Sequence, residues 1–334
     1  MAVDPASKKS KTEMKIGTHS GTFHADEALA VFMLKLLPRF KNSTVVRSRV
    51  PDVLEECDII VDVSGKYDGT KHFDHHQREF VDTFSPEYKT KLSSAGLVFK
   101  HFGKEILSEQ LNVPVEDASI PLLYEKVYAG MIEAIDGNDN GQSAYPDEIK
   151  PAYQTKAITL PGIVAGLNPN WNDDNNDEVL DSKFQVASAL MGSVFVDIVK
   201  YYGKAWLPAR DLVKDALEKC TEYDADGRIV VFDKFVSWKS HLYELEAELG
   251  IEGRSIYVLY SDGKGWRVQA VSLDPDSFKS RLPLPEPWRG VRDQALSDLT
   301  GIEGGVFVHA SGFIGGNATR EGALKMAQKA LAMQ

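Results

Sequence analysis

Cysteine is nearly absent from this sequence. The 334 residues include only Cys57 and Cys220, which are too few for a disulfide framework or for a zinc site built from thiolates. A reducing, intracellular compartment is therefore expected, either cytoplasmic or nuclear, with the mitochondrion as an alternative.

Long apolar runs are also missing. No stretch reaches the roughly 18–20 apolar residues of a membrane span, and the longest candidate, "ALAVFMLKLL", is interrupted by Lys35 and predicts a buried helix. The first residues are polar and basic, without the apolar core of a secretion signal. We expect no membrane partner and a disordered arm at residues 1–14.

Basic residues do not outnumber acidic ones. Lys and Arg total 38 against 49 Asp and Glu, which gives a net charge of −11. A protein that binds nucleic acid non-specifically through a broad basic surface has the opposite balance. A phosphate-rich partner would therefore have to be met by a local basic patch or by bound cations.

The composition is otherwise that of a globular protein, with 43% hydrophobic and 26% charged residues. The N-terminal part alternates strands and helices, which favours an α/β sheet. The predicted strands are 15–18, 43–49 and 57–65, and the predicted helices are 25–37, 93–107 and 120 onward into an acidic loop that ends at 141. The run "CDIIVDVSG" is typical of a buried parallel strand with a carboxylate at its end.

After residue 160 the sequence predicts a polar loop to about 180 and then two amphipathic helices, 181–203 and 205–219. Strand-like runs dominate from there on. They are "GRIVVFDKF", "SIYVLYSDG", "WRVQAVSL" and residues 306–308, before a final helix at 319–333. We expect a mostly parallel sheet with helices on both faces in domain 15–204, and a smaller α/β domain in 205–334.

Histidines and aspartates gather in a few short windows. Five of the eight histidines lie in "HSGTFHADE" and "HFDHHQ". Asp62 ends a predicted strand, and Asp136 and Asp139 follow a predicted helix. Because loops at the carboxyl ends of strands in an α/β sheet converge on one crevice, all of these groups are expected to meet there.

Mixed imidazole and carboxylate donors suit Mn²⁺, Mg²⁺, Fe²⁺ or Zn²⁺. Two ions that share one aspartate would lie about 3.5–4 Å apart, as in enzymes that polarise a phosphoryl oxygen. Each window alone also has an ordinary interpretation: Asp26 and Glu27 are favoured in the first turn of a helix, and "DGNDNG" has the composition of a turn. Together the windows favour a metal site.

A second cluster lies near the C-terminus, in "EGGVFVHASGFIGGNATREGALK". A strand is expected to end at His309, followed by a glycine-rich loop and a helix that opens near Asn317 and Thr319. Glycines let backbone amides approach a ligand, and a helix N-terminus favours an anion. Positive charge for phosphates would come from His309, Arg289, Arg292 and Arg320. The alternative is a plain glycine turn before a capped helix.

In combination, "GTHSGTFHADEALAVFMLK", "FDHHQREF" and "GGVFVHASGFIGGN" resemble the MYG-type (melanocyte-proliferating-gene) exonuclease family of the DHH phosphoesterase superfamily. The resemblance begins near residue 15 and covers nearly all the rest of the chain. It implies two domains with the active site between them, and hydrolysis of phosphodiesters with two divalent ions, Mn²⁺ or alternatively Mg²⁺. For this subgroup it implies a 3′–5′ exonuclease that acts on single-stranded RNA or short oligonucleotides in RNA processing.

The resemblance also implies roles for individual residues. Asp62 is the aspartate shared by both ions and His24 stands where the superfamily usually has an aspartate. His76 faces the scissile phosphate and Asp74 orients its neighbours. The implied metal ligands are His19, His24, Asp26, Asp62, His75 and Asp136, with Asp139 as the competing choice for the last. The implied substrate contacts are His76, His309, Gly304, Gly305, Ser311, Gly315, Gly316, Asn317 and Arg289.

Two other functions are compatible with the same residues. One is a phosphohydrolase for a small substrate such as a dinucleotide, a nucleotide or pyrophosphate, which the negative net charge favours. The other is a non-catalytic module that binds nucleotide. The sequence leaves the oligomeric state open.

Overall fold

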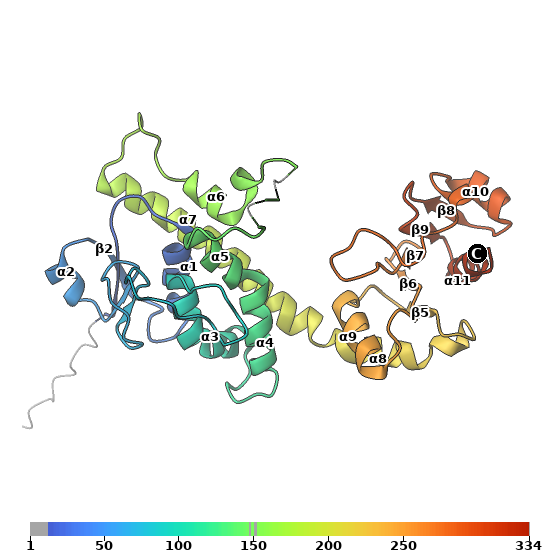
Figure 1. Ribbon diagram of the computed structural model, residues 1–334, viewed down its shortest axis with the longest axis horizontal. Coiled ribbons are helices and arrows are strands. Elements are labelled where there is room, and N and C mark those ends of the chain that lie inside the picture. The colour runs from blue at the N-terminus through green and yellow to red at the C-terminus, as the bar shows by residue number, and fades with distance from the viewer. Residues whose placement is uncertain (1–12, 147, 150–151, 334) are drawn as a thin grey trace, which may run out of the picture. The chain divides into compact units, whose positions relative to one another are not determined.

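The computed structural model describes residues 13–146, 148–149 and 152–333. The predicted disordered arm falls outside these residues as far as residue 12. The chain divides into two compact units, Met1–Tyr202 and Gly203–Gln334, which are coloured blue to yellow and yellow to red in Figure 1. The two units are described separately below.

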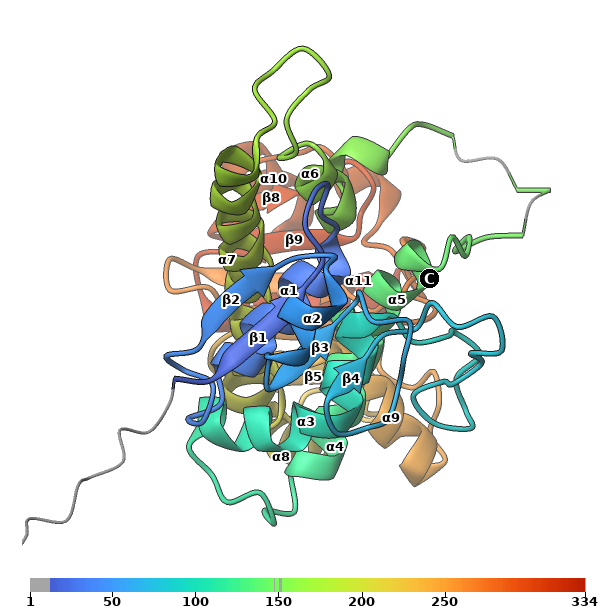
Figure 2. The ribbon, with the colours of Figure 1, turned by 90° about the vertical axis from the view of Figure 1, so that its left-hand side faces the viewer.

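The first unit contains a four-stranded sheet in the order β2-β1-β3-β4. All neighbouring strands are parallel, as the sequence predicts, and Figure 2 shows this sheet with its helices. The strands are β1 (Lys15–Thr18), β2 (Thr44–Arg47), β3 (Ile59–Val61) and β4 (His72–Phe73). Residues directly after these strands therefore emerge at one edge of the sheet.

Helices cover both faces of this sheet because successive side chains of a strand point to opposite sides. Ile60 packs with Leu54 and Cys57 next to α2 (Pro51–Glu55). Ile59 and Val61, which are also buried, point to the other face. The helices of that side are α1 (Ala25–Lys35), α3 (Ser94–Leu111) and α7 (Asp177–Tyr201), and α1 packs against both of the others.

One helical stretch of the described residues, Asp177–Glu218, has the length and composition of a membrane span. The sequence analysis did not single it out. Part of its apolar surface is used inside the first unit: the Ser188 hydroxyl donates to the Ala28 carbonyl (2.9 Å), and Gly192 leaves room for the ring of Phe32. The apolar side of α7 is thus the side that packs against α1.

The helix expected from residue 120 runs further than predicted. It consists of α4 (Ile120–Val127), a π-helical turn (Tyr128–Ile132) and α5 (Glu133–Asp139). The acidic segment predicted to be a loop is therefore helical up to Asp139. Its glycine and aspartates favour a turn by composition, but packing of α5 against α3 and α1 keeps the segment helical.

The polar loop predicted at 160–180 also contains structure. After a 3₁₀ turn (Lys156–Ile158), α6 spans Leu160–Ala165, and the Thr159 hydroxyl caps it by accepting from the Gly162 amide (3.2 Å). Proline usually interrupts a helix, but it is tolerated in the first turn. Pro161 lies in the first turn of α6, so the helix forms. The helix α7 then begins at Asp177.

The second unit has a five-stranded sheet in the order β5-β6-β7-β9-β8. Only β5 and β6 are parallel. The strands are β5 (Ile229–Phe232), β6 (Tyr257–Ser261), β7 (Trp266–Ala270), β8 (Gly305–Val308) and β9 (Ile314–Asn317). The segment predicted as a glycine-rich loop thus includes a strand, in which Gly315 and Gly316 pair with Val268 and Arg267.

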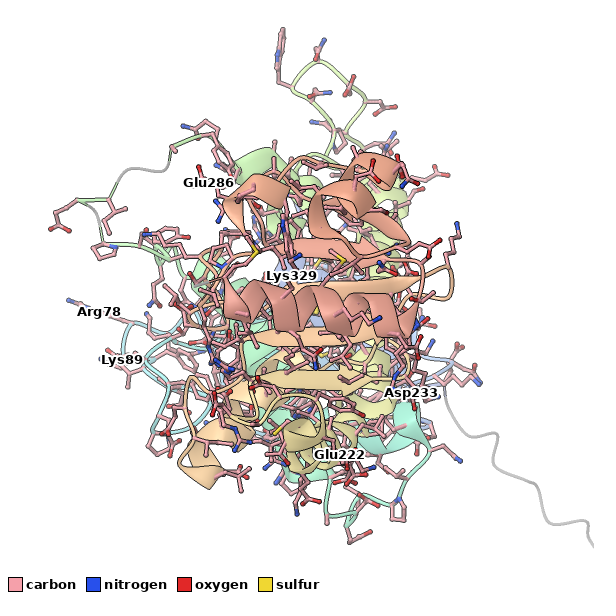
Figure 3. The ribbon with its side chains drawn as sticks, turned by 90° about the vertical axis from the view of Figure 1, so that its right-hand side faces the viewer. Arg78, Lys89, Glu222, Asp233, Glu286 and Lys329 are labelled. Carbon is pink, nitrogen blue, oxygen red and sulfur yellow. The ribbon has the colours of Figure 1, made fainter. Side chains whose placement is uncertain are left out.

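Helices cover this second sheet as well. Val230, Val258 and Tyr260 pack with α8 (Ala209–Glu218) and α9 (Lys239–Leu249) on one face. Val268 and Ala270 pack with α11 (Arg320–Ala332) on the other, and Figure 3 shows α11, with Lys329, lying over the strands. α10 (Asp293–Thr300) adjoins β8, and short turns lie at Tyr202–Trp206, Cys220–Glu222 and Glu286–Trp288. The sequence analysis predicted neither α9 nor α10.

Candidate metal centre and active site

The histidines and aspartates of the first unit meet where three neighbouring strands end. His19 follows β1, Asp62 follows β3, and Asp74, His75 and His76 follow β4. The strands are parallel and adjacent, so these residues emerge at the same edge of the sheet. The structure therefore brings together residues as distant in the sequence as His19 and His75.

The segment between β1 and α1, His19–His24, carries two of the predicted ligands and is called the ligand loop below. The backbone amide of His24 donates to both oxygens of Glu27 (2.9 and 3.0 Å), which caps α1. The carboxylate of Glu27 is fully buried and also lies 3.1 Å from Nε2 of His19. From the sequence, Glu27 was expected only as an acidic residue favoured in the first turn of a helix. Its place three residues after His24 is also the position of a capping box.

Asp62 lies at the centre of the cluster. Its Oδ2 is 3.4 Å from Nε2 of His19, and its Oδ1 is 3.5 Å from Nε2 of His75. Its backbone has φ +59°, the left-handed region that non-glycine residues seldom occupy outside functional sites and turns. Asp62 is thus held between imidazoles that come from two different strand ends.

The charges at this centre are strongly coupled. Burial opposes ionisation of Asp62, but the neighbouring imidazoles of His19 and His75 outweigh it and hold its pKa below the ordinary value. Burial lowers the pKa of the His19 and His75 imidazoles, but the nearby carboxylates raise it by more. Asp62 and Glu27 raise the pKa of His19 to about 9, and Asp139 and Asp62 raise that of His75 to about 10. Each imidazole therefore tends to hold a proton. A metal ion would have to displace that proton, because an imidazole that binds metal is neutral.

Asp26 and His75 present buried atoms without satisfied hydrogen bonds. Neither carboxylate oxygen of Asp26 has a well-aligned partner among the described residues, nor does Nε2 of His75, although Asp139 Oδ2 is 3.0 Å away. Burial raises the pKa of Asp26 well above its usual range, and the like charges of Asp62 and Asp139 add to this. A buried carboxylate without a donor is costly unless a cation neutralises it.

These side chains form three overlapping donor groups whose atoms lie within 4.8 Å of one another. Asp62 belongs to two of the groups and His24 belongs to two. The groups are His19, His24, Glu27 and Asp62; Asp62, His75 and His76; and His24, Asp26 and Asp139. The donors are nitrogen and oxygen only, which suits a hard or borderline divalent cation.

Asp136, the predicted sixth ligand, lies apart from these groups. It is fully buried, and its Oδ1 accepts from the Ser93 amide (2.9 Å), the Ser93 hydroxyl (2.6 Å) and the Gly96 amide (3.0 Å). Its Oδ2 accepts from the Tyr128 hydroxyl (3.0 Å). Burial raises its pKa to about 7 against these hydrogen bonds. Asp136 thus ties the start of α3 to α5, and its position does not support a metal role. Asp139, the competing choice, faces the cluster instead.

His76 and Asp74 are arranged as a pair. His76 has a side chain that is 62% exposed, and its Nδ1 lies 2.7 Å from Oδ1 of the buried Asp74. The other oxygen of Asp74 accepts from the Gly65 amide (2.6 Å). The contact between Asp74 and Nδ1 fixes the ring of His76, so Nε2 is the ring nitrogen left to face a ligand.

The cluster opens into a cavity of about 640 Å³ whose described lining residues belong to the first unit. One wall carries the carboxylates and imidazoles, and Arg49 and Lys156 add positive charge. Arg49 also donates from Nε to the Ser20 carbonyl of the ligand loop (3.1 Å). Pro161, Gly162 and Ala165 of α6 also line this cavity. No pattern in the sequence pointed to these three residues.

The predicted substrate contacts of the C-terminal motif lie in the second unit, and only some of them are accessible. His309 and Ser311 are exposed in the β8–β9 turn, with Nδ1 and Oγ 2.9 Å apart. Arg289 is half-buried and donates to the Leu284 carbonyl. Gly304, with φ +77°, and Gly305 are half-buried where β8 begins.

The remaining predicted contacts are buried: Gly315, Gly316 and Asn317. The side chain of Asn317 donates from Nδ2 to the Glu303 carbonyl, and its Oδ1 accepts from the backbone amide of Thr319 (both 2.9 Å). A side chain on Gly316 would meet Nη1 of Arg267 at 2.8 Å. These residues hold β9 in the sheet, so their positions do not support the predicted contact with substrate.

Comparison with known proteins gives matches along nearly the whole chain. The MYG1_exonuc family model, described as an uncharacterised protein family (UPF0160), matches residues 15–331. A MYG1 protein of Schizosaccharomyces pombe is 57% identical over 320 residues, which cover 95% of this chain and 97% of that protein. The MYG1 exonuclease of Homo sapiens is 46% identical over 342 residues, 99% of this chain and 90% of the human protein.

Among solved structures, RecJ in complex with Mn²⁺ from Thermus thermophilus matches at 14% identity with a TM-score of 0.26. The match covers 96% of this chain and 53% of that chain. A likeness of this size assigns neither a fold nor a ligand.

Proposed function

Because this chain belongs to the MYG1 exonuclease family, we propose that it is a metal-dependent phosphodiesterase. More specifically, we propose a 3′–5′ exonuclease that acts on single-stranded RNA with two divalent ions. The observation that carries the proposal is the placement of Asp62 between His19 and His75, beside the buried and unsatisfied carboxylate of Asp26.

The residues present fit such ions. The proposed ligands are His19, His24, Asp26, Asp62, His75 and Asp139, and Glu27 joins the group around His19. Asp62 and His24 each belong to two groups, but only a carboxylate such as Asp62 can offer a separate oxygen to each of two ions, so Asp62 is the residue we assign to both. When bound, the ions, Mn²⁺ or alternatively Mg²⁺, would polarise the scissile phosphate and lower the pKa of water.

The chain's own residues prepare the substrate. Asp74 accepts the Nδ1 proton of His76 and holds the ring in the lining of the cavity, where its imidazolium form would donate from Nε2 to a phosphate oxygen. The guanidinium of Arg49 lines the same cavity and offers a second donor for phosphate. These contacts supply local positive charge that the net charge of −11 does not provide. A role for His309 and Ser311 in holding a flanking nucleotide is part of this proposal.

The size of the cavity favours short substrates as the second candidate. A volume of about 640 Å³ lies within the range of roughly 300–1,000 Å³ typical of small-molecule sites. A phosphohydrolase for dinucleotides or nucleotides would use the same residues. Comparing substrates of different length therefore separates the two functions.

The test uses single-stranded RNA labelled at the 3′ or the 5′ end, incubated with purified protein and Mn²⁺ or Mg²⁺. A 3′–5′ exonuclease releases the 3′ label at once as a mononucleotide, while the 5′-labelled strand shortens stepwise. Asp62→Asn should abolish both reactions, and the exposed Asp52→Asn, a matched change on α2, should leave them intact. Cleavage without metal, or by Asp62→Asn, would refute the proposal. Activity restricted to dinucleotides would favour the second candidate.

A further inference from the structure

The part of the cavity lining that comes from α6 carries no acid, base or nucleophile. It consists of Pro161, Gly162 and Ala165, which we call the α6 shelf. Ile135 and Val63 line the same cavity and extend its apolar surface. A surface made of small apolar side chains is flat, and burying the face of a planar apolar ligand against it is favourable.

The α6 shelf is held in place from several sides. Val164, which precedes Ala165 on the helix, is fully buried. Gly162 lies so close to the Lys156 carbonyl oxygen that a Cβ would come within 1.7 Å of it, so the backbone of the shelf is packed tightly on the preceding turn. A fixed surface binds without the entropic cost of ordering a loop.

The shelf is also connected to the ligand loop. The side-chain amide of Asn168, three residues beyond Ala165, accepts from the Phe23 amide (3.1 Å) and donates to the Phe23 carbonyl (2.9 Å). Phe23 immediately precedes the predicted ligand His24. The distance between the shelf and the reactive wall is therefore set by direct hydrogen bonds.

The charges around the cavity determine what kind of molecule fits. The reactive wall, with any bound cations, and Arg49 would take a phosphate, and Lys156 lies at the edge of the shelf. The ligand should therefore be anionic at one end and flat and apolar at the other. Asn138, which also lines the cavity, supplies an amide that donates and accepts at a polar edge.

We propose that the α6 shelf binds the nucleoside of the nucleotide that is being released, with its 5′-phosphate at the reactive wall. This inference rests on the proposed function and adds a subsite to it. It assigns recognition of the departing nucleotide to the first unit alone. It also assigns to this wall the preference for nucleotides over other phosphodiesters.

The test compares two esters with the same leaving group, the 4-nitrophenyl ester of uridine 5′-phosphate and methyl 4-nitrophenyl phosphate. Water cleaves the bond between phosphorus and the nitrophenyl oxygen in both, which releases 4-nitrophenol and either uridine 5′-phosphate or methyl phosphate. Only the first ester carries a nucleoside. The ratio of their kcat/KM values therefore measures what the nucleoside contributes to binding.

Ala165→Leu places a larger side chain on the shelf, and Ala157→Leu is the matched control because Ala157 is exposed on the preceding turn and does not line the cavity. We expect Ala165→Leu to lower the ratio by about tenfold or more, through KM for the uridine ester. Ala157→Leu should keep the wild-type ratio. A ratio unchanged in Ala165→Leu, with both esters cleaved, would overturn the shelf and leave the proposed function standing.

A second measurement does not depend on turnover. Calorimetric titration with uridine 5′-monophosphate in the presence of Mn²⁺ should show binding that weakens about tenfold or more in Ala165→Leu and is unchanged in Ala157→Leu. Equal affinity in wild type and Ala165→Leu would contradict the inference. If neither ester is cleaved by wild type but this binding difference is observed, the shelf is supported and the proposed catalytic function fails.

Discussion

Exchanging Asp136 and Asp139 separately for asparagine should divide two roles that lie three residues apart. Both changes keep the shape of the side chain and remove its charge. Asp139 lies 3.0 Å from Nε2 of His75, whereas Asp136 binds the start of α3. We therefore expect Asp139→Asn to weaken Mn²⁺ binding by at least about tenfold, since even the loss of supporting residues around a metal has that effect.

Asp136→Asn should leave Mn²⁺ affinity unchanged and cost little stability. An asparagine oxygen in place of Oδ1 keeps the donors of Ser93 and Gly96, and its NH₂ group in place of Oδ2 donates to Tyr128 once that hydroxyl rotates. At pH 4, where Asp136 is protonated in the folded protein and is therefore neutral like asparagine, the free energy of unfolding should change by no more than about 1 kcal/mol. Asp136→Ala is different, because it leaves four buried donors without an acceptor. At about 1 kcal/mol each, the loss is about 4 kcal/mol, or about 8–16 °C in Tm.

The pH dependence of stability provides a further check on Asp136. Its pKa in the folded protein, about 7, lies above its ordinary value of 3.8, so folding takes up a proton. The stability of the metal-free wild type relative to Asp136→Asn is therefore greatest below pH 4 and declines as the pH rises through about 7. Thermal unfolding of both proteins from pH 4 to pH 8 measures this difference.

Calorimetric Mn²⁺ titration and thermal unfolding of the three variants complete the assay. The assignment is refuted if Asp136→Asn weakens Mn²⁺ binding by about tenfold or more while Asp139→Asn does not. It is equally refuted if Asp136→Ala unfolds at the wild-type temperature.

Three further predictions concern the same site. Glu27→Gln should weaken Mn²⁺ binding by about tenfold or more, measured by calorimetry; wild-type affinity would show that Glu27 only caps α1. His76→Ala should lower kcat by about a hundredfold or more with Mn²⁺ affinity unchanged, and Asp74→Asn should lower kcat less; full activity of His76→Ala would exclude its contact with phosphate. Because the pKa values of His19 and His75 are raised to about 9 and about 10, Mn²⁺ binding must displace protons and should tighten from pH 6 to pH 8; calorimetry in buffers of different ionisation enthalpy should show net proton release, and affinity independent of pH would contradict these shifts.

The strands of the first unit, and the meeting of the residues that follow them, were the features predicted best from the sequence. Short strand-like runs located β1, β2 and β3, and the convergence of parallel strand ends was enough to bring His19, Asp62 and His75 together. This works because side-chain alternation and strand direction are local properties with one geometric consequence.

The choice between Asp136 and Asp139 could not be made from the sequence, because it depends on long-range packing. Asp136 finds its partners 43 and 40 residues away, in Ser93 and Gly96. The segment around Asp136 has the composition of a turn, but its packing against α3 and α1 keeps it helical. The same applies to Gly315 and Gly316, which suggest a loop by composition but pair with β7.

Crystals grown with Mn²⁺ and measured for anomalous scattering test the central claim most directly. We expect two peaks in the first unit on either side of the Asp62 carboxylate, one toward His75 and one toward His19. Crystals of Asp62→Asn should lose at least one of the two. A single peak away from Asp62, or no peak among these residues at saturating Mn²⁺, would contradict a two-metal centre at the strand ends.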